Sequence, residues 1–167
     1  MVPLGAKFGS FDGQIIVTVE GAPYRHLRAI DWSGKVTDLI PTKEIPYAES
    51  INFVPLNLGA SATPIEGLYL AVYTPDVIKA DGSQFAKFKG DAIVGSEYYG
   101  VWRVHWNGTA FETTVLDANP GQLEDGIFVT PNMIDPPGAG CPAKGKDKSN
   151  GDDSDSGKTR ASRPLTD

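Results

Sequence analysis

Three segments of the chain place a glutamate shortly before an apolar run, and these acids are the side chains best suited to chemistry. The glutamates are Glu49, Glu66 and Glu124, and Asn52 and Asp125 lie close to two of them in the sequence. Carboxylate and amide oxygens are the ligands that Ca²⁺ and Mg²⁺ prefer in proteins. These residues would therefore suit a hard-cation site if the fold brought them together. The alternative is that the glutamates are solvated turn residues that precede strands.

No motif for nucleophilic or zinc chemistry accompanies these acids. The chain has two histidines, His26 and His105, and one cysteine, Cys141. A structural zinc site takes four such ligands, and Cys141 lies in a polar C-terminal segment. There is also no Gly-x-Ser-x-Gly motif of the kind that presents a nucleophilic serine. The residues therefore favour a protein that is not an enzyme.

The aromatic residues are expected to serve two purposes. Tyr98 and Tyr99 lie beside Gly100 and are the pair best placed for exposure, so we predict that they bind a ligand by stacking. Trp32 and Trp106 each lie next to a Gly-containing turn, at matching positions of a repeated segment. We predict that both tryptophans fill the space between sheets.

Short apolar runs bounded by turn residues indicate an all-β fold. The runs are rich in Val, Ile, Tyr, Phe and Trp, and Gly (19) and Pro (13) are frequent between them. Asn107-Gly108 predicts a hairpin turn because both residues tolerate a positive φ. No window of ten or more residues shows a helical period. The expected strands are 14–20, 25–32, 35–40, 50–55, 67–73, 76–80, 91–97, 99–106, 109–116 and 126–130.

One strand segment occurs twice along the chain. Residues 13–17 (Gly-Gln-Ile-Ile-Val) return at 90–94 (Gly-Asp-Ala-Ile-Val), and each copy is followed by a strand that ends near Trp32 or Trp106. Recurrence of a strand unit is typical of folds that stack one unit several times. We therefore expect units of consecutive strands packed face to face.

Further segments extend this pattern to a known family. One pattern is a glycine followed by an apolar residue and a tyrosine, as in residues 67–70 (Gly-Leu-Tyr-Leu). The other is a strand that runs from Arg through Trp to Gly, as in residues 28–34 and 103–108. Over about residues 10–131 the chain resembles the NHL-repeat and gluconolactonase-like six-bladed β-propellers.

The resemblance implies a fold and a candidate cofactor. It implies antiparallel blades around a central channel and, by similarity to gluconolactonases, a divalent cation such as calcium held there by Glu, Asn and Asp side chains. On this chain it points to Glu49, Asn52 and Glu124 as metal ligands.

The number of blades is too small for a closed propeller. A blade takes about 40–50 residues, so the chain supplies about three, whereas closed propellers have at least four. We therefore expect a partial propeller that is completed by missing blades of a longer protein or by self-association through exposed sheet edges.

Composition divides the chain into a β-propeller-like domain, residues 1–135, and a polar tail, residues 136–167. The tail has one large aliphatic residue, Leu165, and is predicted to be disordered because it cannot bury enough apolar area. It holds six of the 15 Lys/Arg and five of the 21 Asp/Glu, which leaves nine basic and sixteen acidic residues in the domain. An acidic domain repels phosphate backbones, so nucleic acid is not an expected partner.

The chain shows no segment that would place it in or across a membrane. No apolar run approaches the length of about 18 residues that a membrane span needs. The first residues lack the basic and apolar regions of a signal peptide. We expect a soluble protein whose compartment is undetermined, with an extracellular or periplasmic location open if the chain is truncated at its N-terminus.

These observations lead to two functional hypotheses. The first is a non-enzymatic, β-propeller-like binding or assembly module of unknown ligand. The alternative is a divalent-cation-dependent hydrolase of small lactones or esters, in which Glu49, Asn52 and Glu124 hold a metal that polarises a carbonyl and activates water.

Overall fold

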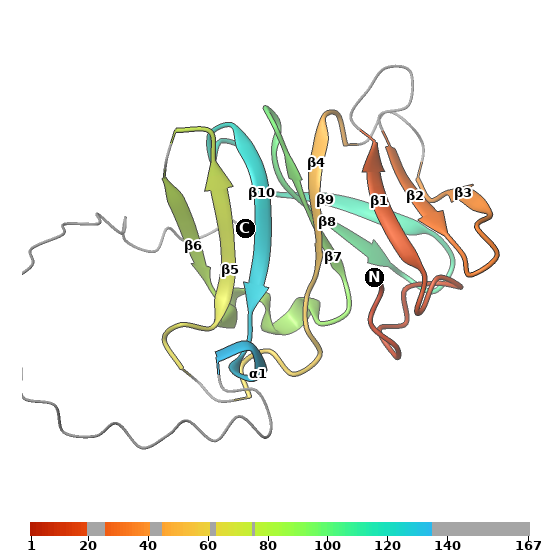
Figure 1. Ribbon diagram of the computed structural model, residues 1–167, viewed down its shortest axis with the longest axis horizontal. Coiled ribbons are helices and arrows are strands. Elements are labelled where there is room, and N and C mark those ends of the chain that lie inside the picture. Colours follow the sequence, from red (N-terminus) through yellow and green to blue (C-terminus); the bar gives the residue numbers. More distant parts are fainter. Residues whose placement is uncertain (20–25, 41–44, 61–62, 75, 135–167) are drawn as a thin grey trace, which may run out of the picture.

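The computed structural model describes residues 1–19, 26–40, 45–60, 63–74 and 76–134, and these ranges form three antiparallel sheets (Figure 1). The expected all-β class is confirmed, and each strand of the described ranges overlaps one of the ten expected runs. The only helical elements of these ranges are short: the 3₁₀ helix η1 (Gly82–Phe88) and α1 (Pro131–Ile134). The predicted disordered tail, residues 136–167, lies outside the described residues.

The sheets are named here by their place in the chain. The N-terminal sheet has the order β1 (Ile15–Val19), β2 (His26–Ile30) and β3 (Val36–Asp38). The central sheet has the order β4 (Ala48–Phe53), β7 (Ala92–Ser96), β8 (Gly100–Trp106) and β9 (Phe111–Asp117). The C-terminal sheet has the order β10 (Leu123–Val129), β5 (Gly67–Val72) and β6 (Val77–Asp81).

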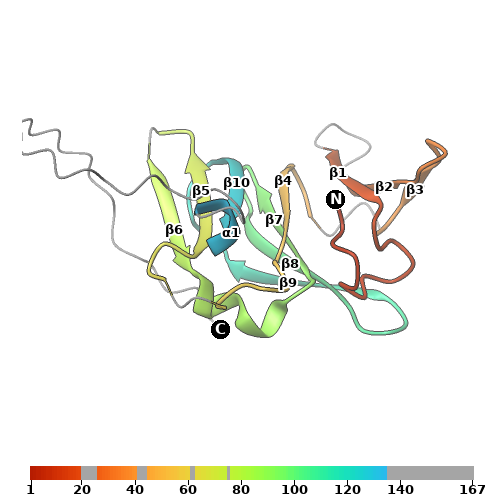
Figure 2. The same ribbon diagram turned by 60° about the horizontal axis from the view of Figure 1, so that its bottom comes forward.

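The central sheet lies between the other two and packs against both (Figures 1 and 2). Successive side chains of a strand point to opposite faces, so a strand that is covered on both faces needs apolar residues throughout. β7 meets this condition, since all five of its residues are buried. Ile93 points into the core shared with the C-terminal sheet, and Ala92 and Val94 point into the core shared with the N-terminal sheet.

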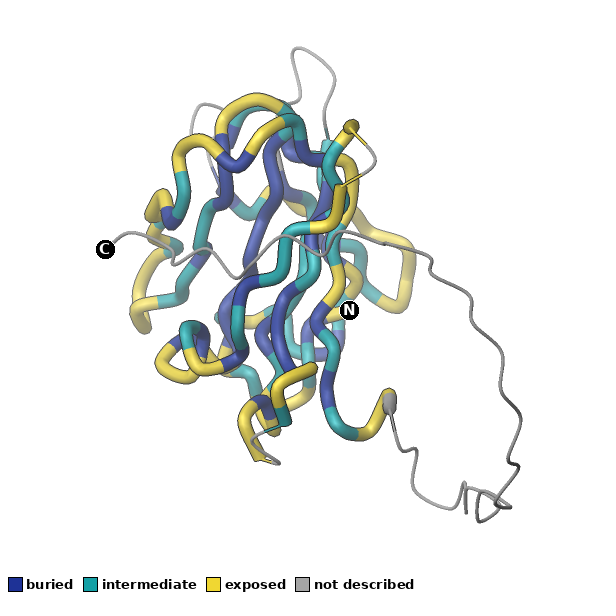
Figure 3. The backbone as a smooth tube through the Cα atoms, turned by 90° about the vertical axis from the view of Figure 1, so that its left-hand side faces the viewer, coloured by how far each residue is buried: buried dark blue, intermediate teal, exposed yellow. Residues whose placement is uncertain are grey.

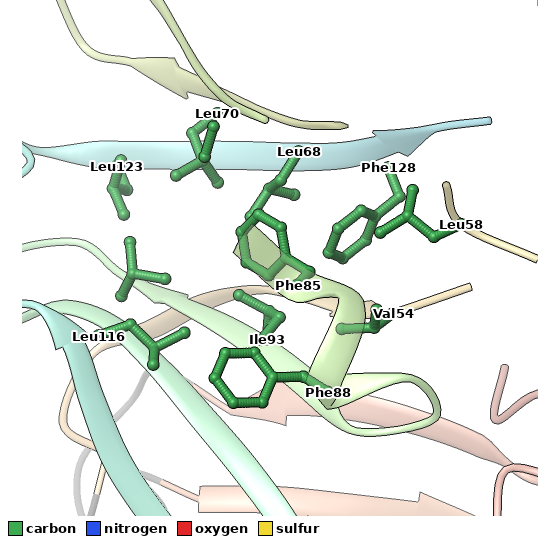
Figure 4. Packing of buried hydrophobic residues seen from close by; sticks show 12 residues of the cluster. Val54, Leu58, Leu68, Leu70, Phe85, Phe88, Ile93, Leu116, Leu123 and Phe128 are labelled. Carbon is green, nitrogen blue, oxygen red and sulfur yellow. The ribbon is translucent and has the colours of Figure 1, made fainter. Parts of the chain in front are cut away.

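The core between the central and C-terminal sheets is closed at one end by η1. Figure 4 shows Phe85 of η1 between the side chains of the two sheets. Its ring meets that of Phe128 edge to face, with 5.1 Å between the ring centroids. Aromatic pairs of this geometry stabilise a core beyond the area that they bury. The other large members of this core are Val54, Leu58, Leu68, Leu70, Phe88, Ile93, Val101, Leu116 and Leu123.

The core between the central and N-terminal sheets is built around Phe8, which lies in the segment before β1. Phe8 is 1% exposed, and its ring centroid is 5.1 Å from that of Phe53 and 4.8 Å from that of Phe111. Residues outside the strands therefore complete this layer. Figure 3 shows the result along the chain: buried stretches run through the strands, and the turns at their ends are exposed.

Strand order differs from the expected blades of consecutive strands. Only the N-terminal sheet is built that way. β4 pairs with β7 along Ala48–Phe53, and the hairpin β5–β6 that lies between them in the sequence belongs to the next layer, where β10 pairs with β5. This pairing satisfies backbone N–H and C=O groups of β4 against a strand that is buried on both faces. Closure around a common axis stays a prediction.

The two copies of the repeated segment begin comparable meanders, β1–β2–β3 and β7–β8–β9. In each meander, the turn after the second strand is closed by a side-chain oxygen that accepts hydrogen bonds from backbone N–H groups. Asp31 accepts hydrogen bonds from the N–H groups of Ser33 and Lys35, at 2.8 and 3.0 Å. Asn107 accepts from the N–H groups that follow it, both at 2.9 Å. The Ser33 hydroxyl and the Lys35 N–H hold the pKa of Asp31 below its ordinary value.

This turn geometry explains why the packing role predicted for Trp32 is wrong. Asp31 and Asn107 occupy the same place in the two turns, so Trp106 precedes that place and Trp32 follows it. Trp106 therefore ends a strand and packs on Phe111, with ring centroids 4.9 Å apart. Trp32 stands in the turn itself and is 80% exposed. The sequence match aligned the tryptophans, but the fold aligns the residues that close the turns.

Among the described residues, no helix is long and apolar enough to cross a membrane.

The two-sided burial of β7 predicts a large cost for truncating its side chains. Ile93→Ala removes buried methyl groups from the core and should lower the free energy of unfolding by about 2–5 kcal/mol. Val115→Ala, at a β9 residue that is 41% exposed, is the matched control and should change it by less than about 0.5 kcal/mol. Urea unfolding followed by circular dichroism measures both. Equal effects would contradict the layered core.

Candidate functional site

One end of the molecule gathers exposed aromatic and polar side chains where three strands begin or end. Tyr98 and Tyr99 lie in the turn between β7 and β8 and are 58% and 50% exposed, so their predicted exposure is confirmed. Tyr47, just before β4, joins them: its ring stacks on Tyr99 at 5.8 Å and 14°, and meets Tyr98 edge to face at 5.7 Å. These three rings and the neighbouring polar residues Glu97, Gln122 and Glu124 are called the strand-end cluster.

Backbone hydrogen bonds hold the strand-end cluster in place. The Glu97 N–H donates to the Tyr47 carbonyl at 2.9 Å, and the Leu123 N–H donates to the Glu97 carbonyl at 3.2 Å. The buried Ser96 hydroxyl donates to the carbonyl of Pro46 at 2.5 Å and accepts from the Tyr99 N–H at 3.2 Å. The segments before β4, after β7 and before β10 are therefore fixed to one another, so the side chains they carry keep their relative positions.

Two carboxylates of the cluster share one amide. The Gln122 side-chain nitrogen donates to Glu97 Oε1 at 2.8 Å and lies 3.3 Å from Glu124 Oε1. Tyrosine rings beside carboxylate and amide groups can stack on an apolar ligand face while hydrogen-bonding its polar groups. The arrangement is suited to binding.

The predicted metal ligands lie on the neighbouring strands β4 and β10. The Asn52 amide nitrogen lies over Gly126, where an added β-carbon would come within 3.1 Å of it. Glu124 is exposed and contacts Gln122, while the main-chain oxygen of Glu49 accepts a hydrogen bond from the Thr18 hydroxyl at 3.1 Å. Over the described parts of the chain, no three His, Cys, Asp or Glu side chains group as metal ligands. A metal at Glu49, Asn52 and Glu124 stays a prediction.

A second polar group lies at the other end of β7, where that strand begins, and has a structural character. Asp91 Oδ2 accepts from Arg103 Nε at 2.7 Å, and Asp91 Oδ1 is 2.8 Å from His105 Nδ1. The guanidinium also lies over the Phe88 ring, 4.4 Å from its centroid. Arg103 therefore pairs with the acid at the start of β7 and not with Glu97 at its end. Every member of this group has a neighbour within the sheet or core.

The C-terminal sheet presents an apolar side to the outside. Its side chains that point away from the core include Tyr69 and Ala71 of β5, Val77 of β6 and Ile127 of β10, and together with Asp125 and Gly126 of β10 they line a shallow groove of about 310 Å³. Val77 and Ile127 are 50% and 49% exposed. These four residues are called the outer apolar face. The charged residues Lys79, which pairs across the strands with Tyr69, and Asp125 border this apolar stretch on the same side of the sheet.

The sequence predicted part of these sites and missed the rest. It identified Tyr98 and Tyr99, but no local signal connects them to Tyr47, which enters through the pairing of β4 with β7. Tyr47 also has a φ of 52°, a backbone conformation that is uncommon for residues other than glycine. The outer apolar face was missed because the position of β10 beside β5 joins segments far apart in the sequence.

Comparisons with known proteins identify no relative. No family model, no curated protein and no solved structure matches this chain. Its function must therefore be inferred from its own geometry.

The Asp91–Arg103 pair and the more exposed Asp38–Arg28 pair of the N-terminal sheet predict different stabilities for matched variants. Asp91 is 10% exposed, so Asp91→Asn removes a charge that Arg103 and His105 face and should lower the free energy of unfolding by about 1–3 kcal/mol. Asp38 is 60% exposed where it pairs with Arg28, so Asp38→Asn should cost less than about 1 kcal/mol. Chemical unfolding at one pH and salt concentration compares them. A larger effect for Asp38→Asn would contradict the assigned roles.

Proposed function

We propose that this protein is a non-enzymatic, β-propeller-like assembly module whose outer apolar face is covered by a sheet of a second copy. The observation that carries the proposal is the outer apolar face itself. Exposed apolar patches that are contiguous and lie on a rigid element are typical of interaction surfaces. No arrangement among the described residues specifically favours the alternative of a cation-dependent hydrolase.

The occupant is inferred from the packing inside the molecule. Both faces of the central sheet are covered by another antiparallel sheet through interdigitating apolar side chains. The C-terminal sheet uses only one face in this way, with Leu68 and Leu70 inward and Tyr69 and Ala71 outward. Within the chain, an apolar sheet face is covered by another sheet on each side of the central sheet. We therefore infer that a further sheet covers the outer apolar face.

The N-terminal sheet offers a complementary surface at the opposite end of the stack (Figure 1). On its outer side, Ile15 pairs across the strands with Ile30, and Ile30 pairs with Val36, beside the Arg28–Asp38 ion pair on the same side. Ile15 is 43% and Val36 is 51% exposed. Contact between unlike faces of two copies is head-to-tail and continues the stack in one direction, giving a ring if the rotation closes. The strand-end cluster stays exposed in such an assembly and supports a ligand-binding role for Tyr98 and Tyr99.

Lysine substitutions on the outer apolar face should prevent this association. In sedimentation equilibrium, the mass-average mass of the unmodified chain should rise with concentration, whereas Val77→Lys/Ile127→Lys should remain monomeric, because each lysine would have to be desolvated in the contact. Leu56→Lys/Val115→Lys is the matched control, since these residues are 43% and 41% exposed but lie outside the face. The control should associate like the unmodified chain. An unmodified chain that is monomeric at all concentrations would refute the proposal.

A mixing experiment tests the head-to-tail geometry. Ile15→Lys/Val36→Lys alters only the N-terminal sheet and should also be monomeric. When the two double variants are mixed, each supplies the face that the other lacks, so they should form a dimer and nothing larger. If the contact instead joined two C-terminal sheets, Ile15→Lys/Val36→Lys would associate alone.

A further inference from the structure

A separate polar cavity lies at the end of the C-terminal sheet where β5 begins and β6 ends. Its volume is about 550 Å³. The segment before β5 contributes Thr63 and Glu66, β6 contributes Lys79 and Asp81, and η1 contributes Ser83. None of these residues belongs to the strand-end cluster or to the outer apolar face. Their side chains carry two carboxylates, two hydroxyls and one ammonium group.

Two oxygens of this cavity's lining are buried and lack a partner. Glu66 is 4% exposed, and its Oε1 has no hydrogen-bond partner; Thr63 Oγ1 is in the same condition. A buried carboxylate oxygen without a partner is unfavourable, because it has lost its hydration without compensation. Lys79, the cationic side chain of the lining, is bonded to Asp81. The cavity therefore holds an acceptor group that the described side chains do not satisfy.

The backbone prevents Glu66 from leaving this position. Its N–H donates to the Thr63 carbonyl and its carbonyl accepts from the Gly82 N–H, both at 3.1 Å. The next residue, Gly67, passes so close to β6 that an added β-carbon would lie 2.3 Å from the Ala80 carbonyl oxygen. Glycine at this position lets β5 start against the end of β6. The same close approach brings Glu66 beside Asp81 and the start of η1.

We propose that this cavity binds a hydrated calcium ion through Glu66, Asp81 and the Thr63 hydroxyl. Every donor in this set is an oxygen, the type of ligand that Ca²⁺ prefers. With two carboxylates and one ammonium, the lining carries a net charge of −1 when all three are ionised, so it attracts a cation. Two acids are fewer than a tight calcium site uses, so water completes the coordination shell, for which the cavity has room. The expected affinity is weak, with a Kd of about 10⁻⁴–10⁻³ M.

Calcium titration of the full chain tests this site. Isothermal calorimetry should show one ion bound per chain, and 10 mM CaCl₂ should raise the Tm by several degrees at constant ionic strength. Glu66→Gln keeps the shape of the side chain and removes its charge, so binding and the Tm shift should both be lost. Asp81→Asn, at a side chain that is 46% exposed, should weaken binding at least tenfold without threatening the fold.

Two further variants separate this cavity from calcium binding elsewhere on the chain. Glu124→Gln alters the metal site expected from the sequence and should bind calcium like the unmodified chain. Lys79→Met removes the competing positive charge and should tighten binding several-fold. The proposal is overturned if the unmodified chain binds no calcium at 10 mM, if Glu124→Gln abolishes binding, or if Lys79→Met weakens it. Association through the outer apolar face is measured independently by sedimentation, so either result can fail alone.

Discussion

The burial of both faces of the central sheet is the constraint on which the rest of the structure depends. β7 can occupy the middle of the molecule only because all five of its residues are small or apolar. Its alternation assigns Ile93 to one core and Ala92 and Val94 to the other, which fixes the position of a sheet on each side. A register shift of one residue would exchange these side chains between two cores of different size and composition. The layers are therefore specified together.

The same constraint decides where polar groups are found. A strand covered on both faces has no place for a charged side chain along its length, so polar residues gather where strands begin, end or reach an edge. The strand-end cluster follows β7 and precedes β10, and Asp91 stands at the entry to β7. Glu66 lies one residue before β5. In each case the backbone hydrogen bonds that terminate a strand also hold the functional side chain in position.

Local patterns in the sequence were sufficient for the strands and insufficient for their arrangement. Alternating apolar runs and Asn107-Gly108 depend on a few neighbouring residues, so the strands and the β8–β9 hairpin could be predicted. Sheet membership depends on pairings between distant segments, such as β4 with β7 and β10 with β5, which local periodicity does not encode. Trp32 shows the risk of aligning by residue type, because the turns align on Asp31 and Asn107. Glu66 was recognised as an acid before a strand, but its lack of a partner is visible only in three dimensions.

The apolar outer side of the C-terminal sheet is a property of those strands and not of the whole chain. Where β9 forms the edge of the central sheet, its exposed side chains include Glu112 and Thr114, the polar residues expected beside water. β5 and β10 place Tyr69, Ala71 and Ile127 at comparable outward positions, where Asp125 is the charged residue of the groove lining. The chain can therefore make a polar sheet surface and does so elsewhere. A sheet with apolar residues on both sides is the pattern of an inner layer, and β7 shows what such a layer requires: a covering sheet on each side. Among the residues that the structure describes, no second sheet covers this side, and the occupant we propose for it is another copy.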